Sequence, residues 1–415
     1  MSTAYLVLSS GQIYEGTAIG CWPEKDRAAA ASFGLGELVF TTGMVGYLET
    51  LTDPSYAGQI ILQGFPLIGN YGVIPEDFEG KPHCKGYVVR ELCEYPSNFR
   101  SEYALDRFLK DQQIPGICGI DTRQIVRTIR EEGVMNACLV SELPEDLDQL
   151  LKQIRAYEVT GVVREASENE IQVFPADQKT AKVSPADSGT EPAHFKVALM
   201  DYGAKHNIIR SLTKRGCEVT LYPADTPAET VLSGSPDGIM LSNGPGDPAE
   251  NTFEIQQIRK MIGKKPIFGI CLGHQLTALA MGLSTYKLHY GHRGANQPVR
   301  RLKDGRCFIT SQNHGYAVER PKAASAAKGA FGEQAPSLSA AVISYENAND
   351  GSIEGMEYPG LDCFTVQFHP EACGGPHDTE FLFDEFVRLM NKTKSGATAK
   401  TDAGMNLAEP EENHA

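Results

Sequence analysis

A cysteine between closely spaced glycines constrains the fold of this chain more than any other feature. The segment reads Gly269-Ile270-Cys271-Leu272-Gly273 and follows the apolar run Pro266-Ile267-Phe268. Glycines on both sides allow the backbone to pass from a strand into a helix through a turn that is too tight for bulky side chains. The pattern therefore predicts a strand, a sharp turn at Cys271 and a helix, the arrangement known as a nucleophile elbow.

The residues beyond 194 alternate between short apolar runs and amphipathic patterns. Such alternation is typical of a doubly wound, mostly parallel sheet with helices on both faces. In these α/β sheets, ligands bind at the carboxyl ends of the strands, where Cys271 is expected to lie. The predicted strands are Val197–Met200, Val219–Leu221, Gly238–Leu241 and Pro266–Phe268, and the predicted helices are Asn207–Lys214 and Phe253–Ile262.

Cys271 has the setting of a nucleophile. At the start of a helix, the helix dipole and unpaired N–H groups favour its reactive thiolate form, and the N–H of Leu272 points to where an oxyanion would form. About 100 residues later, His369-Pro370-Glu371 follows the apolar run 363–368. His369 and Glu371 would share one face of a strand, so they suit a general base and the carboxylate that orients it. A buried structural cysteine and a surface salt-bridge glutamate are the alternatives.

Bulk composition excludes several classes of protein. A net charge of −15 argues against nucleic-acid binding, which needs clustered lysines and arginines. The ten cysteines include no Cys-x-x-Cys pair, so neither a metal site nor a dithiol is indicated, and free thiols suit a reducing cytoplasm. No apolar run approaches the ~18 residues of a membrane span, and the N-terminus does not resemble a signal peptide. We expect a cytoplasmic protein without a membrane segment.

The chain is long enough for two domains. Residues 1–164 have apolar stretches punctuated by Gly, Pro and Asn, which indicate a separate strand-rich α/β domain with helices near 102–111 and 122–132. Residues 165–194 are polar and read as a linker, and 195–391 form the second domain. Residues 321–340 suggest a surface loop insertion, and 392–415 a disordered tail.

The second domain resembles the glutaminase domain of class I glutamine amidotransferases. The similarity rests on Gly269–Gln275, on the loop Asn243–Pro248 and on His369-Pro370-Glu371. The first domain is similar to the N-terminal domain of carbamoyl-phosphate synthetase small subunits. That similarity rests on Phe40–Tyr47, Leu51–Tyr56, Pro66–Gly72 and Gly116–Arg123, and further similar stretches are Asp201–Lys205 and Asn313–Tyr316.

The resemblance implies that Cys271, His369 and Glu371 hydrolyse L-glutamine to glutamate and ammonia. Oxyanion donors would be the N–H groups of Leu272 and of a glycine in Gly244-Pro245-Gly246, with Gly246 favoured over Gly244. The resemblance carries over these glutamine-binding residues: Ser55, Gly244, Gly246, Leu272, Gln275, Asn313, Gly315 and Tyr316.

A partner protein is also implied by the resemblance. Ammonia would pass to a large synthetase subunit, which makes carbamoyl phosphate from bicarbonate and ATP for pyrimidine or arginine biosynthesis. The chain has no Gly-x-x-x-x-Gly-Lys-Ser/Thr phosphate loop, so ATP and magnesium are expected on the large subunit and no cofactor here. The expected assembly pairs one small with one large subunit.

Some positions depart from the family pattern. Gly291–Gln297 carries Arg293 and Gln297 where the family has histidines, and Cys373-Gly374 replaces a Ser-Pro. None of these positions belongs to the proposed catalytic set. Two other hypotheses remain open: a glutaminase that serves another synthase, such as anthranilate synthase, and a catalytically silent structural subunit. The first domain argues against the former, and the intact Cys-His-Glu set against the latter.

Overall fold

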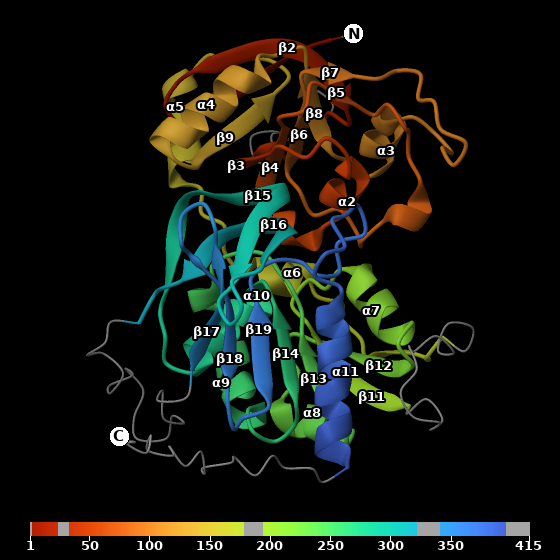
Figure 1. Ribbon diagram of the computed structural model, residues 1–415. Helices are drawn as coiled ribbons and strands as arrows, with labels where there is room; N and C mark the ends of the chain where they lie inside the picture. The colour runs from red at the N-terminus through yellow and green to blue at the C-terminus, as the bar shows by residue number, and fades with distance from the viewer. Residues whose placement is uncertain (1, 24–32, 178–193, 322–340, 396–415) are drawn as a thin grey trace, which may run out of the picture.

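The computed structural model describes residues 2–23, 33–177, 194–321 and 341–395. Its strands form a closed barrel in the N-terminal part, a ten-stranded sheet in the C-terminal part and a small two-stranded sheet. Figure 1 shows the barrel stacked on one end of the large sheet, with two strands of that sheet, β15 and β16, reaching toward the barrel. No helix in the described part of the chain is long and apolar enough to span a membrane.

Seven strands close the barrel in the order β1-β2-β8-β6-β4-β3-β9. The side chains of β4 alternate between two cores: Ile60 and Leu62 pack in one, and Ile61 packs in the other. Closure leaves no exposed sheet edge, which is one way for a strand-rich domain to avoid aggregation. The strands are β1 (Thr3–Leu8), β2 (Ile13–Gly20), β3 (Leu35–Thr41), β4 (Gln59–Gln63), β6 (Gly86–Val88), β8 (Pro115–Cys118) and β9 (Met135–Val140).

Short helices and turns cover this barrel. The helix predicted near 122–132 is confirmed as α4, which Asp121 caps by accepting a hydrogen bond from the N–H of Gln124. The helix predicted from residue 102 begins only at Leu105, because Tyr103 forms a β-bridge with Val73. The elements are α2 (Tyr47–Leu51), η1 (Pro54–Tyr56), β5 (Leu67–Ile68), η2 (Pro75–Asp77), β7 (Glu91–Leu92), α3 (Leu105–Asp111), α4 (Thr122–Glu132), α5 (Leu147–Ala156) and α6 (Val162–Ala166).

The C-terminal sheet has the order β10-β12-β11-β13-β14-β19-β18-β16-β15-β17. Its central strands β12, β11, β13, β14 and β19 are mutually parallel, and the strands on either side are antiparallel. The prediction of a mostly parallel sheet thus holds for the centre only, because the long hairpin β15–β16 extends it. The strands are β10 (Gln172–Phe174), β11 (Phe195–Asp201), β12 (Cys217–Pro223), β13 (Gly238–Leu241), β14 (Ile267–Ile270), β15 (Thr285–Arg301), β16 (Cys307–Val318), β17 (Val342–Asn347), β18 (Ile353–Tyr358) and β19 (Cys363–Val366).

Helices cover both faces of this sheet, as predicted. Helices α8, α9 and α10 share one hydrophobic core, and α7 and α11 share the other, on the opposite face. Phe268 anchors the second core: it is fully buried, stacks on Phe364 at 4.4 Å between ring centroids and meets Phe383 edge-on. The elements are α7 (His206–Thr213), α8 (Ala228–Ser233), η3 (Pro248–Glu250), α9 (Thr252–Met261), α10 (Leu272–Ala280) and α11 (Phe381–Lys394).

Secondary structure occurs near the domain borders proposed from sequence. Strand β10 lies within the segment interpreted as a linker and pairs with the edge of β12. Helix α11 continues to Lys394, past the start of the expected tail, because Met390 and Phe386 hold it on the sheet. Nearly all of the 321–340 insertion and of the tail lies outside the described residues.

Candidate active site

The turn at Cys271 is strained. Strand β14 ends at Ile270 and helix α10 begins at Leu272, so the predicted strand, turn and helix are confirmed. Between them, Cys271 adopts φ 52° and ψ −102°, a conformation whose cost is of order 1–3 kcal/mol for a residue other than glycine. Gly273 makes the close approach possible, because a Cβ atom there would lie 2.5 Å from the carbonyl oxygen of Leu241. The backbone thus holds the thiol at the carboxyl end of the parallel strands.

His369 and Glu371 form a buried pair just after β19. The prediction that they share one face of a strand is wrong, because β19 ends at Val366 and both residues lie beyond it, with Glu371 in a turn. Nδ1 of His369 lies 2.6 Å from Oε1 of Glu371, and both residues are 1% exposed. Nε2 of His369 has no hydrogen-bond partner among the described residues. The Cys271 thiol lies 3.7 Å from the carbonyl oxygen of Asn313 and electrostatically influences the His369 imidazole. The structure therefore brings together the three side chains that the sequence singled out.

Lys205 joins this group, although sequence reasoning did not assign it to the site. Its ammonium lies 3.5 Å from Oε1 of Glu371 and 3.3 Å from Oδ2 of Asp53, in a position that is 8% exposed. It also lies 3.3 Å from Nδ1 of His369, but that nitrogen donates its proton to Glu371, so the ammonium pairs with the two carboxylates. The only sequence signal was that Lys205 closes one of the stretches shared with the family.

The charges in this cluster shift the pKa values of His369 and Glu371 in opposite directions. Burial and the Lys205 ammonium act to lower the pKa of His369, but the charges of Glu371 and Cys271 outweigh them and raise it to about 10. Burial acts to raise the pKa of Glu371, but His369 and Lys205 outweigh it and hold that pKa at about 2. At neutral pH the pair is therefore an imidazolium bound to a carboxylate.

The N-terminal half contributes side chains directly to the site. Oδ2 of Asp53 accepts a hydrogen bond from the side-chain amide of Asn313 at 3.0 Å. The hydroxyl of Ser55 accepts one from the side-chain amide of Asn243 at 2.9 Å. All four residues are buried, so the turn 53–55, the loop after β13 and strand β16 form one hydrogen-bonded unit.

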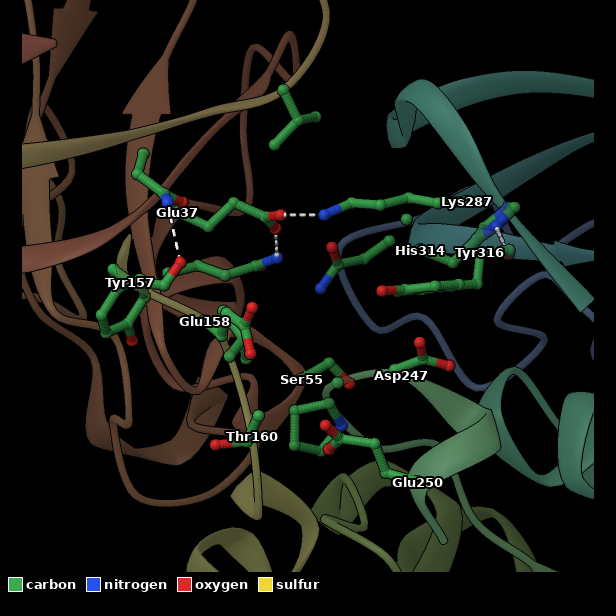
Figure 2. A pocket seen from close by; sticks show the side chains of 18 of the residues that line it. Glu37, Ser55, Tyr157, Glu158, Thr160, Asp247, Glu250, Lys287, His314 and Tyr316 are labelled. Atoms are coloured by element: carbon green, nitrogen blue, oxygen red, sulfur yellow. Dashed lines mark hydrogen bonds and ion pairs between the residues drawn. The ribbon is translucent and has the colours of Figure 1, made fainter. Parts of the chain in front are cut away.

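A cavity of about 480 Å³, called here the main cavity, opens in front of Cys271. Figure 2 shows Ser55 from the N-terminal half and Tyr316 from β16 on its wall, with an ion pair of 2.6 Å between Glu37 and Lys287 crossing from one half to the other. The lining includes Cys271 and seven of the predicted binding residues: Ser55, Gly244, Gly246, Gln275, Asn313, Gly315 and Tyr316.

Two predicted residues have roles that differ from simple cavity lining. The Leu272 side chain is buried in the core and does not line the main cavity, so only its N–H could serve there. The side-chain amide nitrogen of Gln275 donates to the carbonyl of Tyr316 at 2.8 Å and to Oε1 of Gln367 at 3.0 Å. Gln275 therefore lines the main cavity and also holds the backbone of Tyr316 in place by a hydrogen bond.

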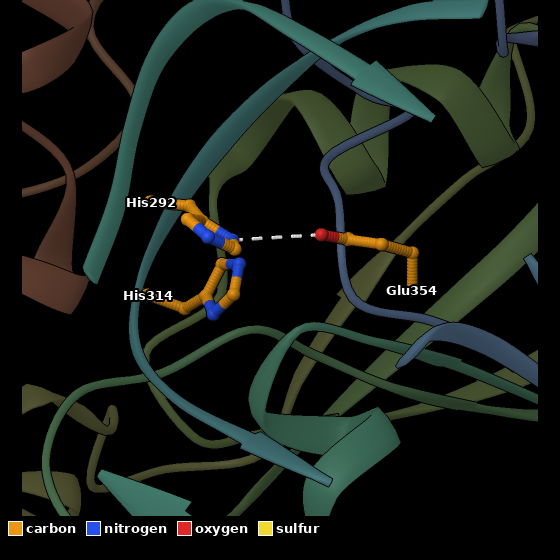
Figure 3. Close-up of side chains that lie close together, drawn as sticks. All are labelled: His292, His314 and Glu354. Carbon is orange, nitrogen blue, oxygen red and sulfur yellow. Dashed lines mark ion pairs between the residues drawn. The ribbon is translucent and has the colours of Figure 1, made fainter. Parts of the chain in front are cut away.

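His292, His314 and Glu354 form a buried cluster contributed by β15, β16 and β18. Ligand-type atoms of His292, His314 and Glu354 lie within 4.8 Å of one another, close enough to hold a metal ion (Figure 3). Hydrogen bonds already engage both His314 nitrogens, and His292 binds Asp350 at 2.8 Å. Burial acts to lower the pKa of His292, but the hydrogen bond that it donates to Asp350 and the nearby Glu354 carboxylate outweigh burial and raise the pKa to about 9. The absence of a metal site stays a prediction.

The chain matches known proteins along both halves. A family model described as the CPSase domain of the carbamoyl-phosphate synthase small chain matches residues 6–139, and one for class-I glutamine amidotransferases matches 198–389. A carbamoyl phosphate synthase small chain from Syntrophotalea carbinolica is 45% identical over 94% of this chain and 98% of its own length. One from Listeria innocua is 45% identical over 95% and 99%.

A solved structure of a glutamine amidotransferase from Thermotoga maritima covers 49% of this chain and 86% of its own at 17% identity, with a TM-score of 0.34. The two family models follow one another in the order of the two halves, and the relatives align over nearly the whole length. The chain belongs to the carbamoyl phosphate synthase small chain family and is the glutamine amidotransferase subunit of that enzyme.

Proposed function

We propose that this subunit hydrolyses glutamine with Cys271 as nucleophile, His369 as acid and base, and Glu371 as the orienting carboxylate. One observation carries the proposal: a strained cysteine at the carboxyl end of the parallel strands, beside a buried His-Glu pair with which it interacts. A structural cysteine needs neither the unfavourable backbone conformation nor an adjacent imidazolium.

The reaction would begin with attack of the Cys271 thiolate on the side-chain amide carbon of glutamine. The imidazolium of His369 gives its proton to the departing ammonia, and the γ-glutamyl group remains on sulfur as a thioester. Neutral His369 then takes a proton from water, which hydrolyses the thioester and releases glutamate. Glu371 holds the ring through Nδ1 at each stage, and its low pKa keeps it charged.

Oxyanion stabilisation would come from the N–H groups of Leu272 and Gly246. Leu272 is the first residue of α10, where N–H groups lack partners within the helix. Gly246 has φ +84° and lines the main cavity, so its backbone can approach a ligand closely. Loss of one such donor typically costs roughly 10²–10³ in kcat.

Glutamine would lie in the main cavity with its amide at Cys271. Ser55, Gly244, Gln275, Asn313, Gly315 and Tyr316 supply hydroxyl, amide and backbone groups for its amino and carboxylate ends. The site combines polar groups from both halves of the chain, which suits a small, highly polar amino acid.

Ammonia would leave through a second, smaller space. A cavity of about 70 Å³, called here the rear cavity, lies between the halves and shares Asn313 with the main cavity. Its lining includes Lys205 and reaches the loop 43–46, where Val45 is 61% exposed. Separate entry and exit would let ammonia pass to the large subunit while glutamine occupies the main cavity. We propose that this large subunit, and no cofactor of this chain, provides the ATP chemistry.

The test is release of ammonia from glutamine by wild type and Cys271→Ser. Each is assayed alone and with a carbamoyl phosphate synthase large subunit, bicarbonate and ATP. Release that depends on Cys271 and yields carbamoyl phosphate with the partner supports the proposal. Release that never couples would point to another synthase, and equal rates for both proteins would overturn the catalytic assignment.

A further inference from the structure

Helix α7 begins without a cap from its own sequence. Its N-cap residue is Lys205, whose side chain has no acceptor atom and makes no capping bond. Helix N-termini normally have Ser, Thr, Asp or Asn there, because the first N–H groups need acceptors. The ammonium of Lys205 is instead directed to Asp53 and Glu371. The acceptors for this helix must therefore come from elsewhere in the chain.

Glu79, from the N-terminal half, supplies them. Its carbonyl oxygen accepts from the N–H of His206 at 2.8 Å, and its side-chain Oε2 accepts from the N–H of Asn207 at 2.9 Å. The N–H of Glu79 in turn donates to the hydroxyl of Thr52 at 2.9 Å. Glu79 is 2% exposed, so these bonds are shielded from water. An acidic group at this end of a helix also interacts favourably with the helix dipole.

The start of α7 is attached to the catalytic pair. The side-chain amide of Asn207 donates a hydrogen bond to the main-chain oxygen of Glu371. Two residues earlier, Lys205 contacts the Glu371 carboxylate. A displacement of this helix end would therefore move both groups that hold Glu371, and Glu371 holds His369. Burial raises the pKa of Glu79 to about 7 against the lowering effect of Lys205, so its carboxyl group is part of the same electrostatic cluster.

We propose that Glu79 is a positioning residue for glutamine hydrolysis: it caps α7 from the other half of the chain and so holds Lys205 and Asn207 against Glu371. The proposal rests on the function proposed above. Glu79 does not line the main cavity. It does line the rear cavity, and its hydrogen bonds go to the start of α7, so we assign its effect on hydrolysis to the arrangement of His369 and Glu371. The N-terminal half would then support the catalytic pair through Glu79, in addition to lining the main cavity.

The experiment compares Glu79→Ala, Glu79→Gln and wild type in the full chain bound to a large subunit. The main-chain bonds of residue 79 to Thr52 and His206 survive both substitutions, so we expect both variants to fold. Glu79→Ala should lower kcat for glutamine hydrolysis by roughly 10- to 100-fold, as small displacements of catalytic groups do. KM should stay within about threefold, because the cavity-lining residues lie on other elements. Glu79→Gln keeps an acceptor oxygen and should recover most of kcat.

A second measurement tests the role of Glu79 independently of the proposed glutaminase function. The rate of Cys271 alkylation by iodoacetamide reports the arrangement of the triad without glutamine turnover, and it should fall in Glu79→Ala and recover in Glu79→Gln. The matched control is Glu91→Ala, an exposed glutamate on β7 of the same half, which should match wild type. Wild-type kcat and alkylation in Glu79→Ala would overturn the positioning role, as would no recovery in Glu79→Gln. If Cys271→Ser retains full activity, the proposed function fails instead, and the alkylation rates still decide the role of Glu79.

Discussion

The ammonium of Lys205 balances two buried carboxylates, and its removal should be costly. We predict that Lys205→Met, which preserves the length of the side chain, destabilises the protein and slows glutamine hydrolysis. The ammonium is 3.3 Å from Asp53 and 3.5 Å from Glu371, and both carboxylates are almost fully buried. Without it, two buried negative charges lose the cation that they share.

The size of the loss follows from the bonds that remain. Removing one partner of a buried ion pair typically costs about 3–5 kcal/mol. Here Glu371 keeps His369, and Asp53 keeps the amide of Asn313 and the N–H of Ser55. We therefore expect the lower end, about 3 kcal/mol of unfolding free energy at pH 7. Because the pKa of Glu371 lies below its ordinary value, its contribution is complete above about pH 4.5 and is lost as pH falls toward 2. The difference between variant and wild type should shrink over that range.

Urea unfolding followed by circular dichroism measures this loss, and the single tryptophan, Trp22, reports separately on the barrel. The matched control is Lys260→Met, which removes an exposed pair with Glu229 at 3.1 Å. Exposed ion pairs contribute little to stability, so this control should stay close to wild type. If Lys205→Met is no more destabilising than Lys260→Met, the Lys205 ammonium does not stabilise the buried carboxylates of Asp53 and Glu371 as predicted.

Three further predictions concern the same site. Gly273→Ala places a Cβ atom 2.5 Å from the carbonyl oxygen of Leu241. We therefore expect the unfolding free energy measured by thermal denaturation to fall by about 1–3 kcal/mol, and the alkylation of Cys271 to become slower. An unchanged Tm would contradict the tight turn. Ser55→Ala removes one of the two acceptors of the Asn243 side-chain amide and leaves the carbonyl oxygen of Gly203. It should cost about 1 kcal/mol in urea unfolding and raise KM for glutamine, whereas an unchanged KM would remove Ser55 from the binding set. Because the pKa of His369 is raised to about 10, its stabilising effect should be complete below pH 6.5 and lost as pH rises to 10. The difference in unfolding free energy between wild type and His369→Gln should decline over that interval, and a constant difference would argue against an imidazolium.

Local pattern was enough to predict the elements that hold the nucleophile. The strand before Cys271 and the helix after it were confirmed to within a few residues, since apolar periodicity and glycine spacing act over short distances. The closure of the barrel and the antiparallel extension by β15 and β16 were not predicted. Both depend on which strands pair, and pairing between remote segments leaves little trace in the sequence of either strand.

What the sequence by itself determined was the chemistry of the site: a cysteine at a sharp turn and a His-Glu pair at a strand end. Those residues are identified by their immediate neighbours, because a sharp turn and the end of an apolar run each span only a few positions. Only the tertiary structure decided which contacts hold the His369–Glu371 pair in place and which residues of the N-terminal half complete the site. Glu79 caps a helix 128 positions further on, Asn243 binds Ser55 across 188, and Asn313 binds Asp53 across 260. Such contacts arise from the packing of the barrel on the sheet, so no local pattern in the sequence reports them.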